Sequence, residues 1–274
     1  MSKETTAGRI QTGPIEMYWE SHGKGGTPLV VIHGGFGLVA LDRTPQVGGM
    51  SGAVIGALAT NRRVIGLELR GHGHTADVAG PFSYEAFGDD IAVALDQLEL
   101  DEADVLGYSL GAGAALRTAI QHPRRVRKLA IVSFPFRRAG WFPEVRAAMD
   151  QLSSAGFEQM KNTPLYAAYA AVAPDPAAFS TLMDKTGDLQ RLDFEWSGDL
   201  ATISAQTLLV FADADSVPTS HVAEFYELLG GGACDAHWDG SLRSRARLAV
   251  LPGRTHYDIF QAPELADVAD RFFD

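Results

Sequence analysis

Short, nearly continuous runs of apolar and β-branched residues recur along this chain, and they limit its fold more than any other feature. Turn residues bound six of these runs, at residues 28–32, 63–69, 104–107, 126–133, 207–211 and 246–251. A strand with one wet face alternates apolar and polar residues, whereas a strand in a parallel sheet is buried on both faces and is apolar throughout. The six runs therefore predict strands of a parallel sheet.

Helical patterns lie between these runs. They cover residues 84–98, 110–121, 221–229 and 262–273. Ser83 is suited to be the N-cap of the first helix. Residues 15–21 instead alternate apolar and polar side chains, which predicts a half-exposed antiparallel edge strand. The alternation of strands and helices predicts the α/β class, with a mostly parallel sheet flanked by helices.

One long segment breaks this alternation. Residues 134–199 have interrupted helical patterns and no convincing strand, with prolines at Pro143, Pro164, Pro174 and Pro176. We expect a helical insertion over one end of the sheet, between two core segments at residues 1–133 and 200–274. A Gly-rich stretch at residues 230–241 predicts a loop that extends from the surface.

Composition excludes some partners and favours one compartment. The 274 residues include 23 Lys and Arg against 34 Asp and Glu, a net charge of −11, which argues against nucleic acid or an anionic membrane surface as a partner. The single cysteine, Cys234, allows no intramolecular disulfide. The first nine residues lack the apolar core of a signal peptide, and no apolar run approaches the ~18 residues of a membrane helix. We expect a cytoplasmic protein.

The sequence Gly107-Tyr108-Ser109-Leu110-Gly111 fits the pattern G-x-S-x-G and lies between a predicted strand and a predicted helix. Small residues at both flanks let the chain turn sharply and push the serine out of the backbone. The helix N-terminus adds free N–H groups with partial positive charge. The position of this motif indicates that Ser109 is a nucleophile.

Four further motifs follow predicted strands: His33-Gly34-Gly35-Phe36-Gly37, Arg70-Gly71-His72-Gly73, Asp213-Ala214-Asp215 and Pro252-Gly253-Arg254-Thr255-His256. In this order and spacing, the set closely resembles the α/β-hydrolase superfamily. The resemblance extends from about Ile15 to the C-terminus and is weakest in residues 134–199, which look like the cap such enzymes carry over the active site. Within the superfamily, the sequence looks most like small bacterial ester hydrolases.

The resemblance implies a catalytic triad. Ser109 matches the nucleophile, and His256, after the last strand, matches the general base. Asp215 matches the acid that orients the histidine, and Asp213 stays an alternative because Ala212 stands where a glycine is common. The resemblance also implies an oxyanion hole, which requires preorganised backbone donors. The matching N–H groups are those of Gly35, Phe36 and Leu110.

Other polar residues have simpler interpretations. His72 and His74 form an H-x-H pattern, but no acidic or cysteine cluster at ligand spacing accompanies it, so we expect no metal site. His33 is interpreted as a buried histidine bonded to backbone rather than a base. Arg137 and Arg138 could bind a substrate carboxylate, although solvated charge is the simpler interpretation.

The insertion is rich in large apolar residues, and a subset could line a pocket between cap and core. The candidates for substrate binding are Phe136, Trp141, Tyr108 and Trp196. We expect a serine hydrolase that cleaves a carboxylic ester of a small, mostly apolar substrate through an acyl-enzyme, with no cofactor. A lactonase, a hydrolase of a C–C bond next to a carbonyl, and a small-molecule receptor on the same fold are the alternatives.

Overall fold

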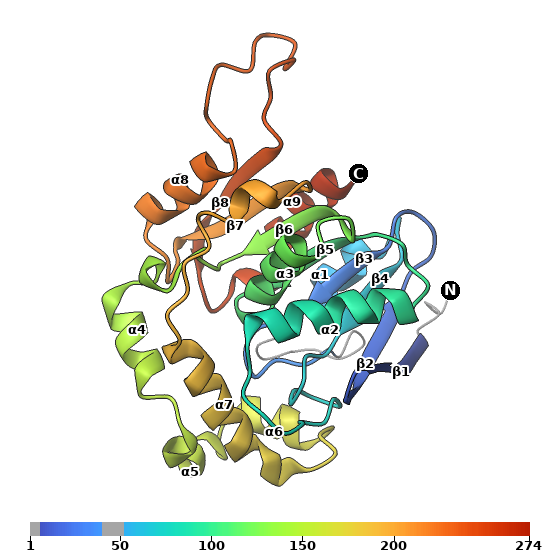
Figure 1. Cartoon of the computed structure of the whole chain (residues 1–274), viewed down its shortest axis with the longest axis vertical. Helices are drawn as coiled ribbons and strands as arrows, with labels where there is room; N and C mark the ends of the chain where they lie inside the picture. Colours follow the sequence, from blue (N-terminus) through green and yellow to red (C-terminus); the bar gives the residue numbers. More distant parts are fainter. Residues whose placement is uncertain (1–5, 40–51) are drawn as a thin grey trace.

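The computed structural model describes residues 6–39 and 52–274 of the chain (Figure 1). Residues 1–5 and 40–51, which belong to the first predicted core segment, lie outside the described residues. Within the described part, one sheet of eight strands has the order β1-β2-β4-β3-β5-β6-β7-β8. The strands are β1 Thr6–Thr12, β2 Ile15–His22, β3 Leu29–Ile32, β4 Val64–Leu67, β5 Ala103–Tyr108, β6 Val126–Val132, β7 Gln206–Ala214 and β8 Ala246–Thr255.

Strands β3 to β8 are the six apolar runs of the sequence. All the pairings between neighbours among these six strands are parallel, whereas β2 pairs antiparallel with both β1 and β4. Parallel strands need crossover connections, and helices supply most of them here. The predicted α/β fold class, a mostly parallel sheet flanked by helices, is therefore confirmed.

The prediction of an edge strand at residues 15–21 is wrong in one respect. Strand β2 is antiparallel as expected, but it lies inside the sheet because β1 covers its outer side. The sequence of β1, TAGRIQT, holds only one large apolar side chain, Ile10, and gives too weak a periodic signal to predict a strand. It forms because its backbone pairs with β2 from Thr6 to Thr12.

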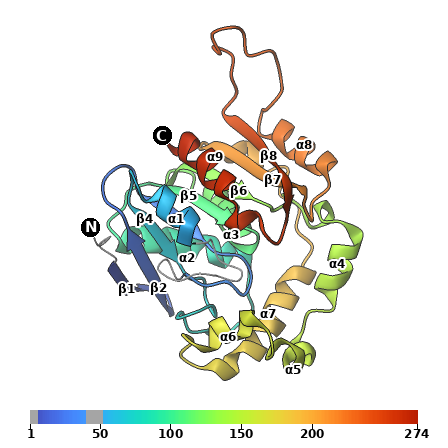
Figure 2. The ribbon, with the colours of Figure 1, turned by 180° about the vertical axis from the view of Figure 1, so that it is seen from behind.

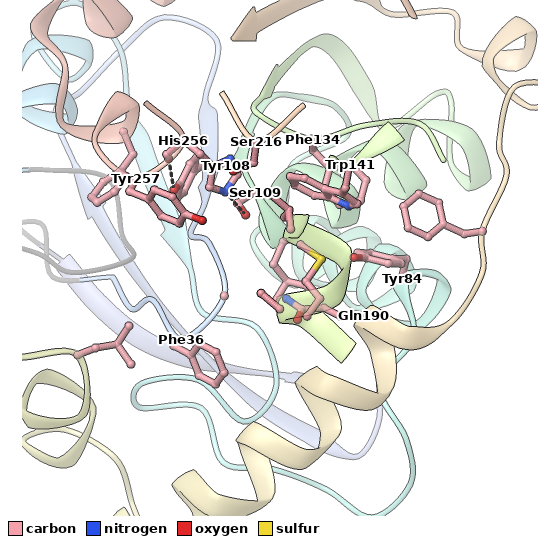
Figure 3. A pocket seen from close by; sticks show the side chains of 18 residues that line it. Phe36, Tyr84, Tyr108, Ser109, Phe134, Trp141, Gln190, Ser216, His256 and Tyr257 are labelled. Carbon is pink, nitrogen blue, oxygen red and sulfur yellow. Dashed lines mark hydrogen bonds between the residues drawn. The ribbon is translucent and has the colours of Figure 1, made fainter. Parts of the chain in front are cut away.

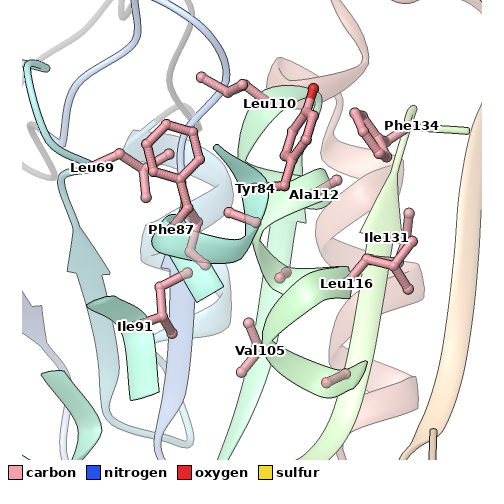
Figure 4. Close-up of a cluster of buried hydrophobic side chains, with 14 of the residues drawn as sticks. Leu69, Tyr84, Phe87, Ile91, Val105, Leu110, Ala112, Leu116, Ile131 and Phe134 are labelled. Atoms are coloured by element: carbon pink, nitrogen blue, oxygen red, sulfur yellow. The ribbon is translucent and has the colours of Figure 1, made fainter. Parts of the chain in front are cut away.

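Helices cover both faces of the sheet (Figures 1 and 2). They are α1 Gly52–Leu58, α2 Tyr84–Gln97, α3 Leu110–Gln121, α8 Thr219–Leu228 and α9 Pro263–Phe273. Alternate residues of β3 reach opposite faces: Val30 and Ile32 join the apolar core under α2, α3 and α8, and Leu29 and Val31 join the core under α1 and α9. Figure 4 shows part of the first core, where α2 and α3 pack on the sheet. Burial on both faces explains why β3 to β7 are largely apolar, whereas β8 lies at the edge of the sheet and leaves Leu248 and Val250 exposed.

Residues 134–199 leave the sheet after β6 and return to it at β7. They contain the helices α4 Pro143–Asp150, α5 Phe157–Met160, α6 Pro164–Ala170 and α7 Phe179–Arg191. These helices form a group beside the sheet (Figure 1), and one isolated bridge, between Arg137 and Glu195, is their only strand-like pairing. The Gly-rich stretch lies in a loop that projects between α8 and β8, with Trp238 fully exposed.

None of the helices within the described ranges is long and apolar enough to cross a membrane.

Candidate active site

Ser109 sits on a strained turn between β5 and α3. Its backbone has φ 50° and ψ −119°, in a region that non-glycine residues rarely adopt. The two motif glycines allow this turn, because a Cβ atom on Gly107 would overlap the Gly111 carbonyl and one on Gly111 would overlap the His33 carbonyl. The local sequence therefore presents the serine side chain at the carboxyl edge of the parallel sheet.

Ser109, His256 and Asp215 form one hydrogen-bonded chain, and Figure 3 shows the part of it between Ser109 and His256. The distance from Ser109 Oγ to His256 Nε2 is 3.1 Å, and that from His256 Nδ1 to Asp215 Oδ1 is also 3.1 Å. A carboxylate can only accept, so Nδ1 carries the proton and Nε2 is free to accept from the serine hydroxyl. Chemically, this arrangement can take a proton from Ser109 and stabilise the resulting imidazolium.

Asp215 is fixed by donors on both of its oxygens. Oδ2 accepts from the Ala212 N–H at 2.9 Å and from the Ser133 hydroxyl at 2.5 Å, and Oδ1 accepts from the Ser216 N–H at 2.7 Å. Its side chain is 1% exposed. Burial by itself would raise the pKa of Asp215, but the hydrogen bond and charge of His256 and the bond from Ser133 outweigh burial and lower it. The carboxylate therefore stays charged.

Asp213 has a different place. Its side chain is exposed and accepts from the Arg254 N–H at 3.2 Å, so it ties the end of β7 to the loop at the end of β8. Backbone N–H groups, that of Gly253 foremost, lower the pKa of Asp213. Of the two aspartates that the sequence left open, Asp215 contacts His256.

Two residues that support the site were not predicted in that role. Ser133, at the end of β6, is fully buried with φ 55° and donates to Asp215. Tyr108, predicted as a substrate contact, also donates its hydroxyl to the His256 carbonyl at 2.6 Å. Burial raises the pKa of Tyr108, so it remains a donor. No sequence signal marked Ser133 beyond its position at the end of an apolar run.

The turn after β3 faces the turn after β5. A Cβ atom on Gly35 would lie 3.9 Å from the Leu110 Cβ, and Gly35, Phe36 and Leu110 all line the cavity at Ser109. His33 holds this turn, because its Nδ1–H donates to the Gly34 carbonyl at 2.7 Å and its Nε2 accepts from the Leu69 N–H at 3.2 Å. Burial lowers the pKa of His33 to about 3, so the ring is neutral and makes both bonds.

A cavity of about 390 Å³ opens at Ser109. Its walls are mostly apolar, with large side chains from Phe36, Leu110, Phe134, Trp141, Val145, Met149, Leu165, Phe194 and Phe260. Among the described residues, no charged side chain lines it. Of the predicted substrate contacts, Tyr108 and Trp141 line the cavity.

Phe136 and Trp196 do not line this cavity. Phe136 is fully buried and stacks on His221, with ring centroids 4.3 Å apart. Trp196 packs against Phe194 at 4.5 Å and Tyr84 at 5.3 Å, behind the cavity wall. The sequence shows that these side chains are large and apolar but cannot show which way each one faces.

The remaining polar candidates are engaged elsewhere. Arg137 pairs with Glu224 at 2.6 Å, and Arg138 pairs with Asp150 at 2.5 Å, so neither faces the cavity. His72 is buried, and burial lowers its pKa to about 4. Within residues 6–39 and 52–274, no group of three or more His, Cys, Asp or Glu side chains could hold a metal ion.

A serine on a strand-to-helix turn, linked to an aspartate and a histidine that follow later strands of the same parallel sheet, defines the α/β-hydrolase class. The family model described as the alpha/beta hydrolase fold matches residues 27–217. The chain belongs to this family.

Relatives of this chain are named for different substrates. The 2-hydroxymuconate semialdehyde hydrolase of Pseudomonas sp. (strain CF600) is 31% identical over 177 residues, which are 55% of this chain and 60% of that protein. The sn-1-specific diacylglycerol lipase of Xenopus laevis is 30% identical over 132 residues, 46% of this chain and 39% of that protein. The chain thus spans at most 60% of the length of these curated relatives.

Among solved structures, that of E-2-(acetamidomethylene)succinate hydrolase is similar over 99% of this chain and 100% of that one, with a TM-score of 0.71 and 21% identity. At this identity the likeness shows the fold alone.

Proposed function

We propose that this protein hydrolyses carboxylic esters of small, mostly apolar and uncharged substrates, with Ser109 as nucleophile. One observation carries the proposal: the hydrogen-bonded chain from Asp215 through His256 to Ser109 ends at a cavity of about 390 Å³ that no charged side chain lines among the described residues. Charged substrates need a paired charge when water is excluded, whereas an apolar ester does not. The walls therefore favour an uncharged acyl group.

In the first step, His256 Nε2 takes the proton of the Ser109 hydroxyl while Oγ attacks the ester carbonyl carbon. Asp215 stabilises the imidazolium through Nδ1–H. The carbonyl oxygen gains negative charge, and the backbone N–H groups of Gly35, Phe36 and Leu110 are the proposed donors that stabilise it. The C–O bond to the alcohol then breaks, and the alcohol leaves with the proton from His256.

The second step returns the free enzyme. Water replaces the alcohol beside His256, which takes a proton from it as the resulting hydroxide attacks the acyl carbon bound to Ser109 Oγ. The tetrahedral intermediate collapses, the acid leaves, and the serine oxygen regains its proton from the imidazolium. No other group is required, because the same histidine acts as base and acid in both steps.

We also propose that residues 134–199 act as a cap that shapes substrate choice. The lining supports this role, since eight of its 18 residues come from this segment: Phe134, Trp141, Val145, Ala148, Met149, Leu165, Gln190 and Phe194. The triad residues directly follow strands β5, β7 and β8 of the sheet. Chemistry and selectivity would then reside in different parts of the chain, which lets one vary without disturbing the other.

A second candidate function is cleavage of a C–C bond beside a carbonyl. The relative that acts on 2-hydroxymuconate semialdehyde favours it. That substrate carries a carboxylate. A cavity lined by no Lys or Arg among the described residues would bind a carboxylate weakly. The nearby cations Arg137 and Arg138 are already paired with Glu224 and Asp150.

The experiment compares the two candidates on one protein sample. Purified enzyme is assayed with p-nitrophenyl acetate and butyrate and with 2-hydroxymuconate semialdehyde, alongside Ser109→Ala. We expect turnover of the esters, little turnover of the semialdehyde, and a loss of about 10³-fold or more in kcat in the variant. An organophosphonate should add one adduct mass at Ser109. Turnover of the semialdehyde but not of the esters would favour C–C bond cleavage over ester hydrolysis. Inactivation by the organophosphonate without an adduct at Ser109 would show that Ser109 is not the nucleophile.

A further inference from the structure

Three polar groups in the wall of the apolar cavity have no hydrogen-bond partner among the described residues. They are the Tyr84 hydroxyl, the Trp141 indole N–H and the Gln190 side-chain amide, and all three residues line the cavity. Figure 3 shows Tyr84 and Gln190 on the far side of Ser109 from His256, whereas the ring of Trp141 packs edge-on against that of His256. Buried polar groups in proteins are normally paired, so groups left open toward a cavity are available to a ligand.

Tyr84 is held rigidly in this position. It opens helix α2 after the capping Ser83, whose hydroxyl accepts from the Ala86 N–H at 3.1 Å, and it is 6% exposed. Its ring packs edge-on against Phe134 and Phe194, each at 5.4 Å between centroids. Burial raises the pKa of Tyr84, so the hydroxyl stays protonated. A fixed, protonated hydroxyl is a preorganised donor.

The other two groups come from the cap segment. Gln190 belongs to the last turn of α7, and its backbone carbonyl accepts from Arg138 Nε at 2.8 Å, which fixes the start of its side chain. The ring of Trp141 lies 5.5 Å from that of His256 and packs edge-on against Phe134 at 5.8 Å. The hydroxyl, the indole N–H and the amide are all neutral, and together they offer more donors than acceptors.

The reaction geometry decides which part of an ester reaches these groups. The leaving alcohol must lie beside His256 Nε2 to receive its proton, so the acyl chain extends from the reacting carbon away from the histidine. That direction leads past Ser109 toward Tyr84 and Gln190 (Figure 3).

From this placement we propose that Tyr84, Trp141 and Gln190 form a subsite for a neutral carbonyl oxygen, as in a ketone or an amide, on the acyl chain of the substrate. The excess of donors selects an acceptor, and the absence of a lining charge among the described residues selects a neutral one. This inference rests on the ester hydrolysis proposed above and narrows its substrate to oxo- or amido-acyl esters.

The test uses two matched series of p-nitrophenyl esters. One series carries 4-oxopentanoate, 5-oxohexanoate and 6-oxoheptanoate, and the other carries unbranched alkanoates of the same chain lengths. We expect kcat/KM for at least one oxo ester to exceed that of its alkanoate partner by about tenfold. A carbonyl without partners in an apolar cavity would instead lower kcat/KM, so the sign of the difference is informative.

Variants then locate the preference. Tyr84→Phe removes the hydroxyl and keeps the packed ring, and we expect it to lower the oxo-to-alkanoate ratio of kcat/KM roughly three- to tenfold. Gln190→Leu should lower the same ratio. The matched control is Tyr169→Phe, because Tyr169 is a buried tyrosine that does not line the cavity, and its ratio should equal that of the wild type.

The outcomes separate the two proposals. If the alkanoates are hydrolysed as fast as the oxo esters at every length, or if Tyr84→Phe keeps the wild-type ratio, the subsite is overturned while ester hydrolysis stands. If neither series is hydrolysed, the proposed function is overturned and the subsite with it. Melting temperatures of the variants confirm that each ratio comes from a folded enzyme.

Discussion

The hydroxyl of Ser133, at the end of β6, donates to Asp215 Oδ2 at 2.5 Å across 82 positions of sequence. This bond acts on the carboxylate oxygen that turns away from His256, since the histidine contacts Oδ1. Ser133 is therefore a positioning residue: it reaches the proposed nucleophile only through Asp215 and His256.

Ser133→Ala should lower kcat by about tenfold and leave KM nearly unchanged, because one of the bonds that orient Asp215 is lost. The Ser133 bond lowers the pKa of Asp215, so its loss should raise that pKa. Steady-state kinetics measure kcat and KM separately. The control is Ser180→Ala, since Ser180 is a partly exposed serine whose hydroxyl donates to the Ala177 carbonyl. A change in KM alone would contradict the positioning role.

Asp215→Asn and Asp213→Asn should differ sharply in activity. An asparagine at 215 favours the wrong tautomer of His256, which in serine proteases costs up to about 10⁴ in kcat. Asp213 is exposed and contacts the Arg254 backbone rather than His256, so its variant should keep most of the activity. Esterase assays of both variants test this expectation. Equal losses of kcat in the two variants would contradict the assignment of Asp215 alone as the residue that orients His256.

Trp141 and Trp196 have side chains of the same size, but their substitution by Ala should have different effects. Trp141 lines the cavity, so Trp141→Ala should change the preference among acyl chain lengths. Trp196 packs behind the wall at 5% exposure, so Trp196→Ala should lower the free energy of unfolding by about 3–5 kcal/mol and act on all esters alike. Chemical denaturation and a chain-length series measure the two effects. A selective change in substrate preference for Trp196→Ala would contradict this division.

His221 should make the fold sensitive to acid. Burial, and after it the charge of Arg137, lowers the pKa of His221 from 6.5 to about 4, while Glu224 and Glu195 act in the opposite direction. Between these values the unfolded chain takes up a proton that the folded chain does not, so stability is present above pH 6.5 and is lost as pH falls toward 4. Between pH 7.5 and 5 the loss should be roughly 2 kcal/mol.

His221→Leu removes this titration. The difference in unfolding free energy between pH 7.5 and 5, measured by urea denaturation, should therefore be smaller in the variant than in the wild type. An unchanged difference would show that His221 does not titrate in this range.

Local sequence determined much of this protein. The apolar runs predicted β3 to β8, and in β3 to β7 the reason is burial on both faces, which leaves a pattern that can be read residue by residue. The G-x-S-x-G motif identified Ser109. The φ of 50° at Ser109 and the close approach of Gly107 to Gly111 both depend only on residues within this five-residue motif. The order of the remaining motifs, through the family resemblance, pointed to His256.

The tertiary structure decided what depends on distant contacts. The sequence left Asp213 and Asp215 open, and the packing of β7 beside β8 brings Asp215 to His256 while Asp213 meets Arg254. Strand β1 was missed because its pairing with β2, rather than its own composition, makes it a strand.

The lining of the cavity was likewise beyond the sequence. In the sequence, Phe136 and Trp141 are both large apolar residues of the same helical segment. In the structure, Phe136 stacks on His221, whereas Trp141 lines the cavity at Ser109. Ser133 and Tyr84 carried no signal of their own. Periodicity records whether a side chain is buried, whereas the partner that buries it is set by how elements far apart in the chain pack together.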